Sequence, residues 1–441
     1  MPNKAIKADD VDVSLILKEL SEHLNYSKQN PFEDVLLVCM QHILGTTFDM
    51  FSVMHELGLK DAVVGGKNYS THLESAEKIK KLGYSYIPDV CQLGYGYFDN
   101  CMREVIHNIW AAAIEKLKTK KFKMMILLDD GADLLRSLPG IFFSEAGKSF
   151  KPDLIIGIEQ TRSGANHPQF IGLPFPVINV AGAFSKTEIE YHYVAKLVLK
   201  SITQITNNEV RPCLSRDPVV GILGYGTMGK AVVRQCIANN IKTIVYDKNH
   251  AKSSSDLPAM FYDNSAILIA NADIIIGCTG ENIFAYQKNL SAALYSRERK
   301  WFVSTGSKDH EFHGLLQLAQ REVKTFGYMP DVFQDIEYKN KLGVSLKIIR
   351  GGFPINFTNE KHSVAPRQIW PTRASLFFAC LMAIEMKNDV GVFMLSHESQ
   401  FLIIKKYIEI NPNDEFVAHL SGLSDKELKE CIVSQSCGKK V

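Results

Sequence analysis

The chain has 441 residues, of which 46% are hydrophobic and 22% charged, a composition typical of a globular protein with two or three domains. The formal net charge of +2 argues against a protein whose main function is to bind polyanions, so we expect no nucleic-acid partner. The longest apolar run, residues 375–384, is too short to span a bilayer, so we expect no membrane association.

The cysteines and the N-terminus indicate the compartment. Nine cysteines are scattered without a CxxC pair, which predicts neither a disulfide framework nor a zinc site. The first twelve residues lack the apolar segment of a secretory signal. We therefore expect a cytoplasmic protein without a bound metal. An HxxH spacing at residues 310–313 does not change this expectation, because on an extended segment the two imidazoles would point to opposite faces.

The first two hundred residues alternate between strand and helix patterns, which predicts a parallel sheet with helices on its faces. The expected strands are residues 35–40, 62–66, 123–128, 151–158 and 176–180, and the expected helices are 47–57, 71–81 and 188–206. Further strands are expected at 219–224, 242–246, 272–277 and 301–304, with a helix at 230–239. From residue 370 onward the pattern is mostly helical, including 402–410 and 425–434.

These elements predict an α/β protein with a discontinuous substrate domain. Asn207, Asn208 and Pro212 mark a hinge after the long helix. We expect the first part of an α/β substrate domain at residues 1–206 and a Rossmann-type NAD-binding domain at 207–359. Residues 360–441 are expected to return to the substrate domain and to form C-terminal helices.

A glycine motif between a strand and a helix carries the cofactor prediction. The first glycine of Gly224-Tyr225-Gly226-Thr227-Met228-Gly229 allows a tight turn, the second lets the backbone approach a pyrophosphate, and the third lets the helix pack on the strand. The helix N-terminus offers free N–H groups to the phosphates. Asp247, about twenty residues further on, would bind a ribose 2′-hydroxyl and repel a 2′-phosphate. We therefore expect NAD as the cofactor.

Several stretches in order resemble the S-adenosylhomocysteine hydrolase (adenosylhomocysteinase) family, across roughly residues 30 to 365. They are Asp129-Asp130-Gly131-Ala132-Asp133, Glu159-Gln160-Thr161-Arg162-Ser163-Gly164, Pro176-Val177-Ile178-Asn179-Val180, Phe184-Ser185-Lys186-Thr187, Cys278-Thr279-Gly280 and Ser304-Thr305-Gly306. The resemblance implies two α/β domains that bind NAD and a nucleoside. It also implies a homodimer or homotetramer. The apolar residues Phe377, Phe378 and Leu381 are compatible with an interface and equally with intramolecular packing.

The resemblance implies transient oxidation of a ribose C3′ by NAD⁺, followed by proton removal at C4′ and loss of the 5′-thioether. Lys186 matches the lysine beside the 3′-hydroxyl, and Asp130 matches a carboxylate near C4′. Glu190 and His42 match further catalytic positions. The alternatives are an exposed lysine at a helix start and an ordinary turn aspartate.

The family's binding residues are carried over in the same way. The implied substrate contacts are Glu159, Gln160, Thr161 and His362, and the implied further cofactor contacts are Thr279, Gly280, Ser304, Gly306 and Asn356. Thr161 is almost as readily a turn-capping residue.

The chain also departs from the family pattern. Gln160 replaces a glutamate, Glu190 replaces an aspartate, and the carboxylate that would meet the adenine amino group is missing near Gly45. We therefore expect an adenosylhomocysteinase-like enzyme that cleaves S-adenosylhomocysteine or a related nucleoside thioether. The alternatives are an NAD-dependent oxidoreductase for another nucleoside or sugar, and a non-catalytic NAD-binding regulator.

Overall fold

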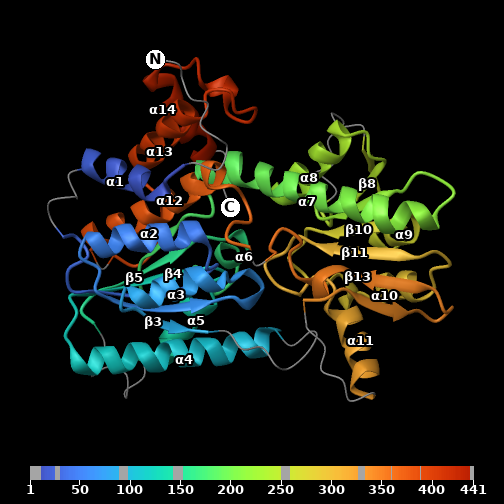
Figure 1. Cartoon of the computed structure of the whole chain (residues 1–441), viewed down its shortest axis with the longest axis horizontal. Helices are drawn as coiled ribbons and strands as arrows, with labels where there is room; N and C mark the ends of the chain where they lie inside the picture. The colour runs from blue at the N-terminus through green and yellow to red at the C-terminus, as the bar shows by residue number, and fades with distance from the viewer. Residues whose placement is uncertain are drawn as a thin grey trace. The chain divides into compact units, whose positions relative to one another are not determined.

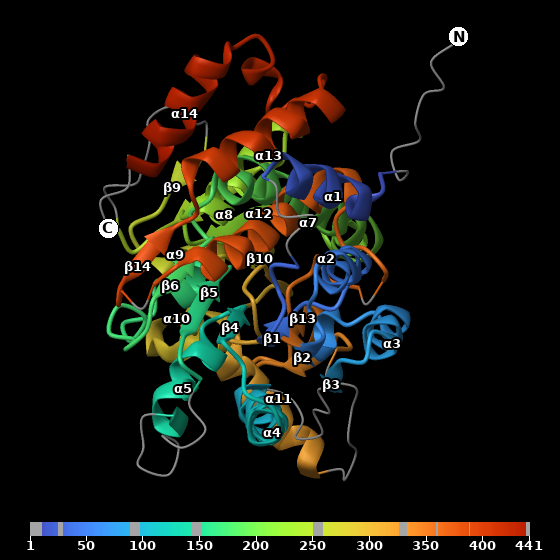
Figure 2. The same ribbon diagram turned by 90° about the vertical axis from the view of Figure 1, so that its left-hand side faces the viewer.

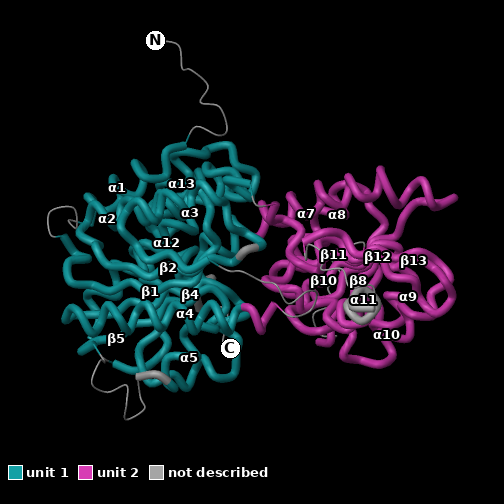
Figure 3. The backbone as a smooth tube through the Cα atoms, turned by 60° about the horizontal axis from the view of Figure 1, so that its bottom comes forward, with its two compact units in different colours: residues 1–90, 102–190, 359–441 teal, residues 91–101, 191–358 magenta. Residues whose placement is uncertain are grey.

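The computed structural model divides into two compact units, each built around its own sheet (Figure 3). Unit 1 comprises residues 1–90, 102–190 and 359–441, and unit 2 comprises residues 91–101 and 191–358. The structure describes residues 11–24, 30–88, 98–142, 152–249, 259–325, 333–358, 360–387 and 389–437.

Unit 1 has a seven-stranded, wholly parallel sheet in the order β14-β6-β5-β4-β1-β2-β3. Its strands are β1 Val35–Gln41, β2 Asp61–Gly66, β3 Ser85–Ile87, β4 Met124–Asp129, β5 Ile155–Glu159, β6 Val177–Asn179 and β14 Val392–Met394. Its helices are α1 Val13–His23, α2 Gly45–Glu56, α3 Leu73–Lys81, α4 Phe98–Thr119 (from Met102 on), α5 Asp133–Phe142, α6 Arg162–Ala165, α12 Pro366–Glu385, α13 His397–Ile410 and α14 Asp425–Cys437.

The central strands of this sheet are buried along their whole length because helices cover both faces. Every residue of β1, β4 and β5 is buried, which explains why these segments are continuous apolar runs. Helices α2 and α12 lie on one face, and α4 and α5 lie on the other (Figures 1 and 2). The α/β class expected from the sequence is confirmed.

Unit 2 also has seven strands, in the order β12-β13-β11-β10-β7-β8-β9, and only the β12–β13 pair is antiparallel. Its strands are β7 Val220–Leu223, β8 Thr243–Tyr246, β9 Met260–Phe261, β10 Ile274–Gly277, β11 Lys300–Ser304, β12 Ile336–Lys339 and β13 Ser345–Ile348. Its helices are α7 Tyr191–Ile205, α8 Thr227–Ala238, α9 Ser265–Asn271, α10 Gln287–Leu294 and α11 His313–Thr325. The order 3-2-1-4-5 of its first five strands is that of a Rossmann fold.

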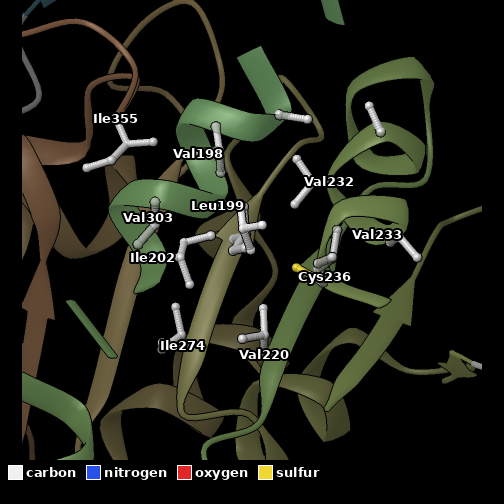
Figure 4. Packing of buried hydrophobic residues seen from close by; sticks show 14 of the residues in the cluster. Val198, Leu199, Ile202, Val220, Val232, Val233, Cys236, Ile274, Val303 and Ile355 are labelled. Atoms are coloured by element: carbon white, nitrogen blue, oxygen red, sulfur yellow. The ribbon is translucent and has the colours of Figure 1, made fainter. Parts of the chain in front are cut away.

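The packing of α7 places the boundary between the units at residue 190, whereas the sequence analysis sets it at 206. Figure 4 shows the apolar face of α7, with Val198, Leu199 and Ile202, against residues of α8 and the sheet. Because this face is buried in the core of unit 2, α7 belongs to that unit and not to the substrate domain.

The C-terminal segment is mostly helical, as expected, but it also contributes the edge strand β14, which the sequence analysis did not predict. Helix α12 is buried in unit 1. Phe377, Phe378 and Leu381 are at most 1% exposed, so they form core and provide no oligomer interface.

Two further observations concern the compartment expected from the sequence. No helix among the described residues is long and apolar enough to cross a membrane. Cys101 is disulfide-bonded, although the cysteine pattern predicts no disulfide framework. The cysteine spacing alone does not reveal such a single pair.

Candidate functional site

The glycine turn of unit 2 has three glycines with three different spatial requirements. Gly224 has φ +98°, and a Cβ there would lie 2.7 Å from the carbonyl oxygen of Cys278. A Cβ on Gly229 would overlap the carbonyl oxygen of Gly224, so helix α8 packs on the turn through bare backbone. At Gly226, in contrast, a Cβ would meet no atom within 4 Å. The open space at Gly226 therefore lies where a dinucleotide-binding turn admits the pyrophosphate.

The start of α8 is suited to an anion. Gly226 is the N-cap residue and provides no side-chain cap, so the helix N-terminus keeps unsatisfied N–H groups and a partial positive charge. Thr227 and Met228 form the first, half-buried positions of the helix. These residues fit the phosphates of a dinucleotide.

Asp247 follows β8 beside this turn and is 8% exposed. Its Oδ2 accepts a hydrogen bond from the Tyr225 amide at 2.6 Å, and its Oδ1 accepts one from the Asn249 amide at 2.8 Å. Asp247 thus fixes the shape of the glycine turn in addition to the ribose contact expected of it.

The other expected cofactor residues lie at the carboxyl ends of β10 and β11, the edge where doubly wound sheets bind ligands. Thr279 and Gly280 follow β10, and Ser304 ends β11, where its Oγ accepts a hydrogen bond from the Gly306 amide at 3.1 Å. Asn356 is half-buried and lies next to Ile355, whose amide donates to the Ser304 carbonyl at 3.0 Å. The structure therefore brings these five residues to one edge of the unit 2 sheet.

A buried glutamate between the two histidines of the HxxH spacing supports the loop after β10. Glu311 is 0% exposed; its Oε1 accepts from the Gly280 amide at 2.6 Å, and its Oε2 accepts from the Thr279 hydroxyl at 3.3 Å. Burial raises the pKa of Glu311 to about 7, although these hydrogen bonds act in the opposite direction. Burial also raises the pKa of the Cys278 thiol, which disfavours a nucleophilic thiolate there.

Unit 1 gathers a second group of candidate residues, one from the end of each of four adjacent strands. His42 follows β1, Lys67 follows β2, Asp130 follows β4 and Gln160 follows β5. Parallel pairing in register brings the carboxyl ends of these strands together. All four side chains are buried, at 9% exposure or less.

Asp130 is the centre of this group. Its carboxylate contacts Lys67 Nζ and Gln160 Nε2, and its Oδ2 lies 3.2 Å from His42 Nε2. His42 Nδ1 in turn lies 2.5 Å from the Ser70 hydroxyl. The structure therefore brings His42, Asp130 and Gln160 together with Lys67, a residue that the sequence analysis did not single out.

These contacts determine the charges of the group. Burial alone would raise the pKa of Asp130, but Lys67 and then His42 outweigh it and hold the pKa well below its usual range. Burial lowers the pKa of His42 despite the attraction of Asp130, so the imidazole is neutral at pH 7. Asp130 is therefore an anion at neutral pH and a weak proton acceptor, in contrast to the C4′ base that the resemblance implies.

Two further buried carboxylates, Glu159 and Asp129, hold the loops that follow β4 and β5. Glu159 is 0% exposed and accepts hydrogen bonds from the amides of Gly131, Ala132 and Thr161 and from the Thr161 hydroxyl, at 2.6–3.1 Å. Burial, followed by the neighbouring Asp129, raises the pKa of Glu159 well above its usual value. Glu159 therefore holds the loop after β4, and its expected role as a substrate contact has no support here.

Thr161 is used in the same way. Its hydroxyl accepts from the Gly164 amide at 3.1 Å and caps α6. The turn-capping alternative is thus observed.

Lys186 lies in a π-helical segment, Ser185–Glu190, directly before α7. Its Nζ donates to Glu190 Oε1 at 2.6 Å, and Lys186 is only 5% exposed. Thr372 of α12 donates to the other oxygen of Glu190. The alternative of an exposed lysine is wrong, because Lys186 is buried and forms an ion pair with Glu190, four residues later in the chain.

An arginine of α12 reaches the start of α2. Arg373 Nε donates to Thr46 Oγ1 at 3.2 Å, and both residues are buried. His362 lies against Gly45, where any Cβ would overlap its imidazole ring. This contact explains why the first residue of α2 has no side chain. Gly45, where the family's carboxylate is missing, and His362, an implied substrate contact, are therefore neighbours within unit 1.

Comparisons with known proteins give relatives but no function. No family model matches the chain. Two uncharacterized proteins of Mycobacterium tuberculosis, from strains CDC 1551 / Oshkosh and ATCC 25618 / H37Rv, are 26% identical over 369 residues, which is 81% of this chain. The chain spans 66% of the length of these curated relatives.

Solved structures that share similarity with the chain include several dehydrogenases. An NADPH-dependent glyoxylate/hydroxypyruvate reductase of Sinorhizobium meliloti is 14% identical with a TM-score of 0.29, covering 44% of this chain and 63% of the reductase. A Granulicella formate dehydrogenase is 14% identical with a TM-score of 0.30, covering 55% and 64%. The TT0316 protein of Thermus thermophilus is 9% identical with a TM-score of 0.32, covering 78% and 96%.

Proposed function

We propose that this chain is an NAD-dependent enzyme that oxidises a hydroxyl group of a small molecule. The observation that carries the proposal is the glycine turn, in which Gly224 and Gly229 exclude a Cβ while Gly226 leaves open space at an uncapped helix N-terminus. The specific form that we propose, from the resemblance, is transient 3′-oxidation and cleavage of a nucleoside thioether such as S-adenosylhomocysteine.

The residues of unit 2 fit a dinucleotide, and we assign each a part in holding it. The N–H groups of the α8 start would bind the pyrophosphate, and Asp247 would bind a ribose hydroxyl and reject a 2′-phosphate. The loops after β10 and β11 would contact the rest of the molecule. When bound, NAD supplies a hydride acceptor.

The residues of unit 1 provide proton transfer and orientation. Lys186 Nζ, held by Glu190, would exchange a proton with the substrate hydroxyl, and Thr372 would keep Glu190 in position. Asp130 is tied to Lys67 and has a lowered pKa, so we assign it the role of orienting His42 and the substrate. His42 is neutral, and we assign its imidazole as the acceptor of a second proton.

Cofactor binding tests the first half of the proposal. Calorimetric titration with NAD and with NADP should show micromolar or tighter NAD binding and weaker NADP binding, because a 2′-phosphate would meet the Asp247 carboxylate. Tighter binding of NADP would contradict this assignment.

NADH formation tests the second half. Single-turnover absorbance with S-adenosylhomocysteine and a panel of nucleosides should show reduced cofactor, and Lys186→Ala should lower that signal about a hundredfold or more. Lys200→Ala, which removes an exposed lysine of α7, is the matched control and should behave as wild type. Asp130→Asn should lower the NADH signal less than Lys186→Ala does, because Asp130 orients groups and does not itself exchange the proton of the oxidised hydroxyl. If the protein binds NAD but none of the tested substrates yields NADH, the result favours the alternative of a non-catalytic NAD-binding regulator.

A further inference from the structure

We propose that unit 1 binds the carboxylate group of a small monoanionic ligand at Arg373, at the N-terminus of helix α2. No residue pattern in the sequence analysis assigns this position. The site consists of Arg373 from α12 and Thr46 from the first turn of α2.

The guanidinium of Arg373 is buried without a counterion. Its side chain is 4% exposed; Nε donates to the neutral Thr46 hydroxyl, and Nη1 has no hydrogen-bond partner. No carboxylate among the described residues forms an ion pair with it. A buried, unpaired arginine costs several kcal/mol of desolvation free energy unless a charge neutralises it, which makes this an unusual residue to keep for stability alone.

Two buried carboxylates act electrostatically on Arg373, and each already forms an ion pair with a lysine. Asp130 is paired with Lys67, and Glu190 is paired with Lys186 at 2.6 Å. Both carboxylates, and the half-buried Asp49, lie within electrostatic range of Arg373 but make no contact with it. Among the described cations of this site, the pairing leaves Arg373 without an ion-pair partner.

The position of Arg373 at the start of α2 also favours the binding of an anion. Its Nε is bonded to Thr46, so the guanidinium lies at the first turn of a twelve-residue helix, where the backbone dipole is positive. An arginine fork and a helix N-terminus together favour a planar, bidentate oxyanion.

The same neighbours select a monoanion over a dianion. A carboxylate would neutralise the single uncompensated charge. A phosphate dianion would place a second negative charge near Asp130, Glu190 and Asp49, which would repel it.

This inference rests on the proposed function only if the carboxylate ligand is also the substrate of the enzyme. In that case the substrate carries a carboxylate that binds at Arg373. The binding test below requires neither NAD nor turnover. Carboxylate binding without NAD binding would reject the proposed function alone, and NAD binding without carboxylate binding would reject this inference alone.

The first experiment is calorimetric titration of the full-length protein with benzoate, with neutral benzamide and with inorganic phosphate. We expect saturable binding of benzoate and at least about tenfold weaker binding of benzamide and phosphate, since each loses the charge match. Arg373→Met should weaken benzoate binding by about tenfold or more, and Arg373→Lys should weaken it less. Arg103→Met, which removes an exposed arginine of α4, is the matched control and should bind benzoate as wild type does.

The second experiment separates a binding role from a structural one. An arginine that stabilises the empty fold would lower the melting temperature when removed, whereas an uncompensated buried charge should raise it by several degrees on substitution to methionine. Benzoate should raise the melting temperature of the wild type but not of Arg373→Met. Equal benzoate affinities for wild type and Arg373→Met, a preference for phosphate, or a lower melting temperature of Arg373→Met would each overturn the proposal.

Discussion

Gly226 and Gly229 stand three residues apart in one turn, yet a side chain would have opposite effects at the two positions. Gly226→Val should fold normally, because its Cβ meets open space, but should abolish NAD binding by occupying the space of the pyrophosphate. Gly229→Ala should instead destabilise the protein by about 2 kcal/mol or more, because its Cβ overlaps the Gly224 carbonyl. Thermal unfolding and NAD titration of both variants check this contrast. Loss of stability in Gly226→Val would show that the space is not open.

The Lys67–Asp130 pair is buried, so each partner depends on the other. Lys67→Met should lower the free energy of unfolding by about 3–5 kcal/mol at neutral pH, because it leaves a buried carboxylate unpaired. The double variant Lys67→Met/Asp130→Asn should recover most of that loss, and urea unfolding measures both. Asp130 has a lowered folded-state pKa, so its contribution is complete above the unfolded value of about 4 and disappears as the pH falls further. A double variant as unstable as the single one would contradict the pairing argument.

Also at the scale of residues, the sequence identified most of the buried polar residues at the strand ends of unit 1, but it did not identify their roles. The resemblance implied active-site roles for His42, Asp130 and Gln160 separately, and the structure places the three together because each directly follows a buried parallel strand. Lys67 occupies the same position after β2, and this register could have revealed it. Arg373 could not be assigned in this way, since nothing in a helical run of apolar residues specifies which residue faces Thr46.

At the scale of elements, the loop after β10 is held by hydrogen bonds to one titratable side chain, that of Glu311. Glu311 has a folded-state pKa of about 7, raised by burial from its usual value, so the folded protein holds a proton there that the unfolded chain releases near pH 4. Its contribution to stability is therefore present below pH 4 and is lost as the pH rises from about 4 to 7. Glu311→Gln keeps the acceptor for the Gly280 amide but removes the titration.

This substitution should flatten the pH dependence of unfolding. Relative to wild type, Glu311→Gln should gain about 2–4 kcal/mol of stability between pH 5 and pH 8. Urea unfolding at several pH values measures the difference. Parallel curves for the two proteins would show that Glu311 titrates normally in the folded state.

Strands that are fully buried were predictable from sequence, and edge strands were not. A continuous apolar run such as β1 or β4 has a sequence signal because both of its faces are covered by helices. β14 has three residues, none of them buried, and lies at the edge of the sheet beside β6, so neither length nor periodicity distinguishes it from a loop. The assignment of α7 also required tertiary packing, since its apolar stripe fits either domain equally well in sequence.

At the scale of the whole molecule, the expected homodimer or homotetramer now has only the resemblance behind it, because Phe377, Phe378 and Leu381 are buried within unit 1. We retain it as a prediction. Light scattering at micromolar concentration should give twice or four times the mass of 49.5 kDa. A monomer mass would reject it.

Each unit has its own sheet and its own proposed ligand, so ligands should protect different parts of the chain from hydrogen exchange. NAD should slow amide exchange most strongly in residues 220–229 and 243–247 and in the loop after β10, because these segments form the proposed dinucleotide site. Benzoate should slow it most strongly around residues 45–47, where α2 begins beside Arg373. Hydrogen-exchange mass spectrometry of wild type, Gly226→Val and Arg373→Met resolves the two effects. Gly226→Val should lose only the NAD-dependent protection and Arg373→Met only the benzoate-dependent protection. NAD protection that survives in Gly226→Val, or that falls mainly on the unit 1 sheet, would mean that the dinucleotide binds elsewhere.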